Sequence, residues 1–434
     1  MISPEAVGFF GVILMLAMIA IRVPVAIAMI AVSVLGTSIL VSPSAALLKL
    51  GGDAFAYSKI YTLSVMPLFI MMGAFLSQAR LGGALYELFD TLLGKIRGGL
   101  AMATIAASAL FAAVSGSAIA TATTIASVSV DEMRKYDYDE GLAAGCAAVG
   151  GTLGILIPPS STLVLYGALT EETIGGCLIA GIIPGILTAI LLMITVYIVV
   201  MKNPSLAPAV STKENKKVTW QLIKKVWVIP TIFFISIGGI YLGVFTPTEA
   251  GAVGAFLALV LTVIQRKLSW KDFWEAMNQS AKINSMTFLV LIGGLMFGRF
   301  LTLSRLPLHL SNFVTTLDIN RYLVLAVIFA IYFILGCIMD GMAILAIMTP
   351  VVYPIIRSLG FNGIWFGVLT VLMLNIGLLT PPVGVVSLVT ASITKVPPMK
   401  VFKGVVPFWI TLIVASIIVI AFPQLATFLP SLMK

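Results

Sequence analysis

Charged residues are scarce in this chain. Only 10% of its 434 residues are Asp, Glu, Lys or Arg, whereas a soluble domain carries about 25%. Hydrophobic residues make up 60% of the chain, and its mean hydropathy is +1.12. These values exclude an ordinary soluble domain. They predict an all-α polytopic protein that crosses a lipid bilayer, because helices satisfy their own backbone hydrogen bonds there.

Histidine and cysteine are also rare. The chain has one histidine, His309, and three cysteines, Cys146, Cys177 and Cys337, without CxxC spacing. Buried thiols that act as small hydrophobic groups are the simplest interpretation of the cysteines. No Gly-rich phosphate loop with a lysine is present, so an ATPase is excluded.

Groups for enzyme catalysis are equally sparse. The acidic run between Asp131 and Glu140 is interleaved with Arg134 and Lys135, which is typical of a solvated loop. His309 has no partner motif and is expected near the solvent-facing end of its segment. We therefore expect a protein that is not an enzyme, with an intramembrane enzyme or a channel as the remote alternative.

The net charge of +9 is carried by short loops between apolar runs. This pattern fixes membrane orientation and does not indicate nucleic-acid binding. The first apolar run follows Glu5 and precedes Arg22, the reverse of a signal peptide, so we expect a retained first helix.

A broken-helix motif occurs twice. Gly154-Ile155-Leu156-Ile157-Pro158-Pro159 recurs as Gly377-Leu378-Leu379-Thr380-Pro381-Pro382. The interval from Gly154 to Gly377, which we call the repeat offset, also separates Pro24 from Pro247, Gly181 from Gly404 and Pro184 from Pro407. We predict two homologous repeats, 1–200 and 226–434, joined by a basic cytoplasmic linker at 201–225. Paired broken helices in two halves of a membrane protein indicate a transporter's binding site.

Each half is predicted to contain five crossings, one of them broken, and one re-entrant hairpin. The crossings are expected at 5–21, 24–41, 60–78, 140–170 (broken) and 176–200, then at 226–245, 247–264, 283–301, 361–392 (broken) and 403–430. The hairpins are expected at 98–130 and 320–357, where arms of about 16 residues are short for a full span. Five crossings per half would make the repeats inverted, with both termini periplasmic and most of the 26 Lys and Arg residues inside.

The predicted breaks offer oxygen atoms without charge. The first hairpin turns at Ser115-Gly116-Ser117, and Thr152, Ser160, Ser161 and Thr380 lie near the Gly-Pro-Pro turns. Proline has no N–H, so carbonyl groups near these turns lose helical partners and become hard ligands that suit Na⁺. Alternatively, Pro-Pro only kinks two packing helices and the hydroxyls bond back to the i−4 carbonyls.

Few ionisable groups are expected at membrane depth. Asp340, at the turn of the second hairpin, is essentially the only acid there, which favours Na⁺ coupling over proton coupling. Arg299 fits either a residue that snorkels to the outer interface or a counter-charge for an anionic substrate.

These motifs resemble those of one family. Ser115-Gly116-Ser117-Ala118, the Gly154 to Ser160 break, Thr246-Pro247-Thr248-Glu249-Ala250-Gly251 and Gly377 to Gly384 are similar to the large membrane subunit of TRAP (tripartite ATP-independent periplasmic) transporters. The resemblance covers essentially the whole chain. It implies a Na⁺-driven elevator-type importer of organic acids, such as sialic acid or C4-dicarboxylates, in the bacterial inner membrane. The implied partners are a separate four-helix membrane subunit and a periplasmic solute-binding protein.

The resemblance also implies roles for individual residues. Na⁺ ligation is implied for Ser115, Gly116, Ser117, Gly150, Thr152, Gly154, Pro158, Gly336, Asp340, Gly341, Thr380 and Pro381. Substrate contact is implied for Ser117, Ser160, Ser161, Arg299 and Asp340. A stand-alone divalent anion/sodium symporter, a transporter of similar build that needs no binding protein, is the main alternative.

Overall fold

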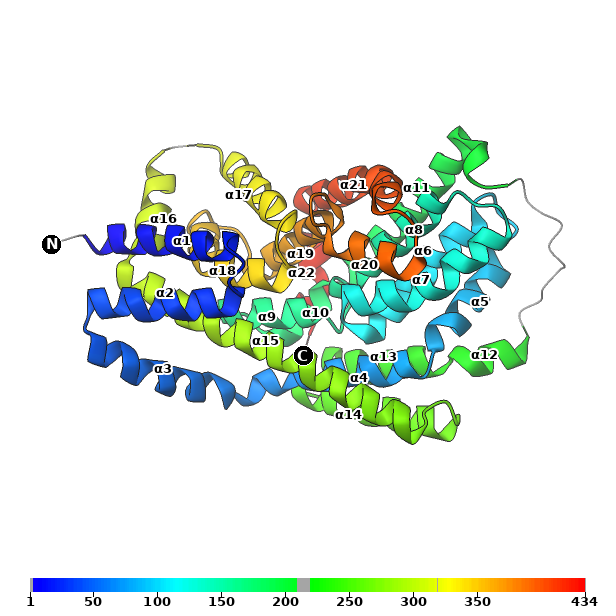
Figure 1. Ribbon diagram of the computed structural model, residues 1–434, viewed down its shortest axis with the longest axis horizontal. Coiled ribbons are helices and arrows are strands. Elements are labelled where there is room, and N and C mark those ends of the chain that lie inside the picture. Colours follow the sequence, from blue (N-terminus) through cyan, green and yellow to red (C-terminus); the bar gives the residue numbers. More distant parts are fainter. Residues whose placement is uncertain (1–2, 209–218, 318, 434) are drawn as a thin grey trace.

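The computed structural model describes residues 3–208, 219–317 and 319–433. Within these ranges the chain forms 22 α-helices and three short 3₁₀ helices, and no strand (Figure 1). The fold is therefore all-helical, as the composition predicts.

The helix bounds in the first half are α1 (Pro4–Ala20), α2 (Val25–Leu40), α3 (Pro43–Ser58), η1 (Tyr61–Ser64), α4 (Val65–Gln78), α5 (Leu81–Leu93), α6 (Gly99–Ser115), α7 (Ala118–Lys135), α8 (Glu140–Thr152), η2 (Leu153–Ile155), α9 (Ser161–Thr170), α10 (Ile174–Ala180), α11 (Ile182–Lys202) and η3 (Pro204–Leu206). In the second half they are α12 (Trp220–Val226), α13 (Val228–Tyr241), α14 (Pro247–Ile264), α15 (Trp270–Ser304), α16 (Leu306–Thr316), α17 (Arg321–Gly336), α18 (Gly341–Ser358), α19 (Gly363–Leu379), α20 (Val385–Thr394), α21 (Pro398–Ala421) and α22 (Gln424–Ser431).

Six described helical segments are long and apolar enough to cross a membrane. They are Tyr61–Gln78, Ile174–Lys202, Pro247–Ile264, Trp270–Ser304, Gly341–Ser358 and Pro398–Ala421, and the bent pair α12 and α13 makes a seventh. Shorter apolar helices, among them α1, α2, α6 and α17, accompany them. The protein is thus a multi-pass membrane protein.

The helix bounds follow the repeat offset found in the motifs. The outgoing arm of the first hairpin, α7, spans 118–135, and that of the second, α18, spans 341–358, so the two arms match at both ends. The stretch that forms α3, η1 and α4 in the first half corresponds to the single 35-residue helix α15 in the second. The opposite insertion of the two repeats stays a prediction.

Some observed bounds differ from the expected ones. The crossing expected at 283–301 is the later part of α15, which begins at Trp270 because Ser269 and Asp272 form a capping box there. The crossing expected at 403–430 is divided into α21 and α22. The expected linker contains η3 and the start of α12, while Lys213, Lys216 and Lys217 lie outside the described residues.

The long helix α15 runs through the molecule and packs against α2, α4 and α18 (Figure 1). The two helices that lead into the breaks, α8 and α19, are buried along almost their whole length. Irregular backbone at membrane depth is tolerated only where protein or a water-filled cavity covers it. The first break is itself buried from Leu156 to Ser160, whereas Pro381 and Pro382 of the second break are exposed on the surface of the described chain.

Candidate functional site

The first hairpin turns within two residues. The incoming arm α6 ends at Ser115, Gly116 adopts a left-handed conformation with φ +63°, and Ser117 caps the outgoing arm α7. The hydroxyls of Ser115 and Thr121 are hydrogen-bonded at 2.5 Å, and Ser115 is buried. Glycine is required at the turn because a left-handed backbone strains other residues.

The tip of this hairpin is bonded to the first break. The amide and the hydroxyl of Ser161 donate to the carbonyl oxygen of Gly116 at 3.4 and 2.9 Å. A Cβ on Gly116 would lie 2.6 Å from the Pro159 carbonyl oxygen, and a Cβ on Gly154 would collide with the Ser117 carbonyl oxygen. The two glycines therefore permit a direct backbone contact between the tip and the break.

The first break follows its Gly-Pro-Pro sequence. After α8 and η2, a cis peptide bond joins Pro158 to Pro159, and α9 starts at Ser161 with Ser160 as its cap. The Ser160 hydroxyl donates to the Ile155 carbonyl at 2.6 Å, across the break. The Thr152 hydroxyl bonds back to the Val149 carbonyl at 2.7 Å.

The second hairpin and break repeat this construction. Asp340 caps α18 by accepting the Met342 amide at 3.0 Å, and the Val383 amide donates to the Cys337 carbonyl at 3.1 Å. Gly336, the last residue of α17, touches Gly377 of α19 backbone to backbone. The Thr380 hydroxyl donates to the Ile376 carbonyl at 2.6 Å, and a cis bond joins Pro381 to Pro382.

Both tips line one pocket of about 360 Å³, which we call the central pocket. Its polar lining residues are Ser77, Ser117, Thr123, Thr124, Ser161, Thr162, Gln279, Thr287 and Asp340. Residues of the first turns of α7, α9, α18 and α20 also line it. Helix amino ends carry partial positive charge, so the first turns of four helices beside one cavity favour an anion. Some of their N–H groups are already bonded, because the Ser161 amide donates to Gly116 and the Met342 amide to Asp340.

The structure brings together most of the predicted site residues. Ser117, Ser161, Asp340 and Gly341 line the central pocket, and Ser115, Gly116, Gly154 and Ser160 lie directly behind it in the tip and the break. Asp340 is the one acid among the lining residues, and its side chain is exposed to the pocket.

Arg299 lies elsewhere. Its guanidinium bonds both carboxylate oxygens of Asp53 on α3, at 2.8 and 3.0 Å. The pair lines a separate pocket of about 230 Å³ together with Lys49. Arg299 thus neutralises a buried carboxylate of the neighbouring helix and is not among the residues that line the central pocket.

Two buried polar residues near the breaks were not predicted. Neither amide atom of Asn375 has a hydrogen-bond partner among the described residues, although the side chain is fully buried. Asn375 is the counterpart of Thr152 under the repeat offset, so the offset could have pointed to it. The Ser108 hydroxyl, which faces Gly150, also has no partner within the described part of the chain. Buried polar groups without partners are uncommon in proteins.

Other residues of the central pocket carry no sequence signal. Gln279 and Thr287 sit on α15, and Ser77 on α4 bonds the Thr124 hydroxyl at 3.1 Å. Single polar residues in apolar helices are common, so only the packing of α4 and α15 beside the tips identifies them.

Comparison with known proteins decides the family. The family model described as the DctM component of the tripartite ATP-independent periplasmic transporter matches residues 12–425. The chain belongs to this family. It is the large permease subunit of a TRAP transporter, which confirms the resemblance seen in the motifs, and its relatives are permeases rather than enzymes.

Several relatives match over most of their length. The chain is 35% identical to the C4-dicarboxylate TRAP transporter large permease protein DctM of Pseudomonas aeruginosa, over 87% of this chain and 88% of that protein. It is 32% identical to the sialic acid TRAP transporter large permease protein SiaM of Vibrio cholerae, over 86% and 87%. It is 30% identical to the 2,3-diketo-L-gulonate TRAP transporter large permease protein YiaN of Escherichia coli, over 86% of each chain.

A solved structure shares the fold. The Alcanivorax borkumensis YdaH transporter, whose crystal structure is described as having an unusual topology, superposes with a TM-score of 0.62. The match covers 89% of this chain and 90% of that chain at 14% sequence identity. This likeness supports the fold alone.

Proposed function

We propose that this TRAP permease subunit imports an organic acid by Na⁺-coupled transport and that the acid binds in the central pocket. The observation that carries the proposal is the convergence of four helix amino ends on one cavity of about 360 Å³. A carboxylate placed there would lie at the positive ends of the helix dipoles and accept those backbone N–H groups that the helix caps leave free.

The names of three relatives agree with a carboxylate as the recognised group. C4-dicarboxylates, sialic acid and 2,3-diketo-L-gulonate, the compounds in the names of three relatives, are all carboxylic acids. They differ in the rest of the molecule, so the shared part of the site would hold the carboxylate. The polar side chains of Gln279 and Thr287 would face the variable part.

Na⁺ fits the remaining features of the pocket. Asp340 and an anionic substrate in the same cavity repel each other unless a cation lies near both. The buried hydroxyl of Ser115 at the first tip, the Ser108 hydroxyl within α6 and the Asn375 amide oxygen within α19 offer neutral oxygen atoms. Hard cations prefer such oxygen ligands, so we place Na⁺ beside each tip, at the residues named above from the resemblance.

The transport cycle, the partner proteins and the membrane location are also proposed. The hairpins and broken helices would move as one body past α2, α4, α14 and α15 in an elevator-type motion. The partners would be the small membrane subunit and a periplasmic binding protein, in the bacterial inner membrane with both termini periplasmic. The membership in the TRAP family favours this over a stand-alone divalent anion/sodium symporter.

Uptake by proteoliposomes tests the proposal. The liposomes would contain this chain and its small subunit, and the binding protein would be supplied loaded with its ligand. We expect uptake with an inward Na⁺ gradient, and none when either partner is left out. Equal uptake driven by a pH gradient in the absence of Na⁺ would contradict the coupling.

A further inference from the structure

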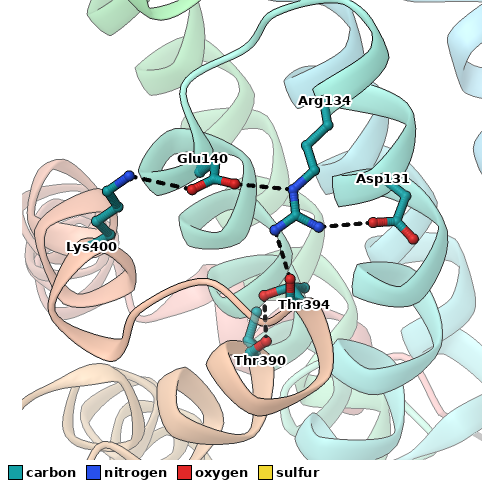
Figure 2. Close-up of polar contacts among 6 residues, drawn as sticks. All are labelled: Asp131, Arg134, Glu140, Thr390, Thr394 and Lys400. Atoms are coloured by element: carbon teal, nitrogen blue, oxygen red, sulfur yellow. Dashed lines mark hydrogen bonds and ion pairs between the residues drawn. The ribbon is translucent and has the colours of Figure 1, made fainter.

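A polar network joins the two repeats at the far end of α7. Arg134, the penultimate residue of α7, donates to Asp131 at 2.9 Å and to Glu140 at the start of α8 at 3.2 Å. Its third bond, at 2.7 Å, goes to the carbonyl oxygen of Thr394, the last residue of α20 (Figure 2). Arg134 thereby bonds the first hairpin to the broken helix of the other repeat.

Glu140 extends the network into α21. Its second carboxylate oxygen accepts the ammonium group of Lys400, in the first turn of α21, at 3.3 Å (Figure 2). Further along α8, Gly145 packs on Gly404 of α21, and a Cβ on Gly145 would lie 2.7 Å from the Gly404 backbone. The ion pairs and the glycine contact together fix α7 and α8 against α20 and α21.

The second repeat contains a matching arginine. Arg357 is the counterpart of Arg134 under the repeat offset of the Gly-Pro-Pro motifs, and it is likewise the penultimate residue of its hairpin arm, α18. Its guanidinium lies 4.0 Å from a carboxylate oxygen of Glu172, which comes just after the end of α9 in the first repeat and also accepts the Tyr353 hydroxyl at 2.5 Å. Each arginine therefore contacts the segment that ends the broken helix of the opposite repeat.

Both arginines stand at a distance from the central pocket. Each arm of 18 residues is about 27 Å long, with its amino end at the pocket and its arginine at the other end. A change at an arginine can reach the pocket only by moving the arm or the broken helix that it contacts. Cross-repeat contacts at the far ends of both arms would keep the distance between the two tips constant while the hairpins and broken helices move together.

We propose that Arg134 and Arg357 are a matched pair of positioning residues that hold each hairpin against the broken helix of the opposite repeat. The inference rests on the proposed function, since the spacing that they preserve is that of the proposed Na⁺ and carboxylate sites. Isolated surface ion pairs contribute little to stability. Arg134 differs from these because its planar fork bonds a carboxylate and a fixed helix-terminal carbonyl at once.

The chain offers a neighbouring control for Arg134. Lys135 carries the same charge but pairs with Glu132 of its own helix, at 2.8 Å. The Lys135→Gln variant loses one positive charge without touching α20 or α21, so it separates the effect of net charge from that of the cross-repeat bonds.

The first measurement is hydrogen exchange of the purified complex with the small subunit. In Arg134→Gln we expect the amides near the end of α20 to exchange about 10-fold faster than in the unaltered protein, because a bond to a charged group is lost. Lys135→Gln should match the unaltered protein. Equal exchange of α20 in the two variants would overturn the proposal, whatever ion drives transport.

The second measurement is uptake as a function of Na⁺ concentration, normalised to folded protein. We expect Arg134→Gln to raise the half-saturating Na⁺ concentration about 10-fold, with Arg134→Lys intermediate because an ammonium lacks the planar fork. Arg357→Gln should raise it in the same direction but less, because the Arg357 pair with Glu172 is 4.0 Å long and partly exposed. A purely structural role would lower the amount of folded protein and leave the Na⁺ dependence unchanged, which would contradict positioning. If the unaltered protein needs no Na⁺, the proposed coupling fails, and the exchange result still decides whether the arginines tie the repeats together.

Discussion

The contact between Gly336 and Gly377 gives a sharp prediction for the second tip. A Cβ added to Gly377 would lie 2.5 Å from the Gly336 Cα and 2.8 Å from its carbonyl carbon. Both atoms belong to the backbone, so a change of side-chain rotamer cannot relieve the clash. Either α17 or α19 must therefore shift by about 1 Å to restore an ordinary van der Waals distance. Overpacking of this kind costs about 1–3 kcal/mol, more than the gain of about 1 kcal/mol from replacing glycine by alanine in a helix.

The shift should reach the proposed ion site. Asp340 follows Gly336 by four residues, and Thr380 follows Gly377 by three. A displacement of about 1 Å at a preorganised site can cost about 100-fold in activity, so we expect Gly377→Ala to lower the apparent Na⁺ affinity 10- to 100-fold by the same reasoning. The assay is uptake by proteoliposomes across a Na⁺ titration.

Gly238→Ala is the matched control. Gly238 also lies inside a helix, α13, but a Cβ there would meet no heavy atom of the described residues within 4 Å. We expect this variant to transport normally. If Gly377→Ala transports as well as Gly238→Ala at every Na⁺ concentration, the close backbone contact does not position the second tip.

Three further predictions concern the tips and the orientation of the chain. Ser115→Ala and Ser117→Ala each remove an oxygen at the first tip. A lost bond to a charged group costs about 1.5–3 kcal/mol, so the apparent Na⁺ affinity should fall roughly 10- to 100-fold. If both variants show a normal Na⁺ titration, the tip is only a packing feature. Asp340→Asn keeps a good helix cap but removes the charge, so folded protein should persist while Na⁺-driven uptake is lost; unchanged uptake would remove Asp340 from the coupling mechanism. For the orientation, single cysteines replace Ser44 and Asp137 in a background without Cys146, Cys177 and Cys337. An impermeant maleimide should label Ser44→Cys, but not Asp137→Cys, from the periplasmic side, and external labelling of Asp137→Cys would overturn the proposed insertion.

Local signals made the hairpins and breaks predictable. Glycine and proline act on their own backbone, so the turn at Gly116 and the break at Pro158-Pro159 could be placed without knowledge of the packing. The repeat offset added long-range information, because it related positions such as Gly154 and Gly377 before any contact was known. The turn at Gly116 and the break at Pro158-Pro159 accordingly lie at the expected residues, while the re-entrant course of the hairpins stays a prediction.

Helices that are short or carry polar side chains were harder to predict. α3, α5 and α16 have 16, 13 and 11 residues and carry polar side chains, so a search for long apolar runs passes over them. The start of α15 was missed for the same reason, since its first turns contain Lys271, Asp272 and Glu275. The capping box at Ser269 was a usable signal for that start.

Contacts between distant residues could not be derived from one sequence. Arg299 and Asp53 are 246 residues apart, and their pairing depends on how α3 lies against α15. Arg299 was predicted to contact the substrate because of its positive charge, and its pairing with Asp53 could not be foreseen. Likewise, the polar residues of α4 and α15 that line the central pocket become relevant only through packing.

The proposed site for the organic acid is the central pocket, between the two hairpin tips. This binding site is best tested by an experimental structure of this chain with its small subunit. The sample would contain Na⁺ and the organic acid that the binding protein carries. We expect the carboxylate between the first turns of α7 and α18, close to Ser117 and Gly341, with Na⁺ behind the tips. An acid bound instead beside Arg299 and Lys49, with the central pocket empty, would contradict the account.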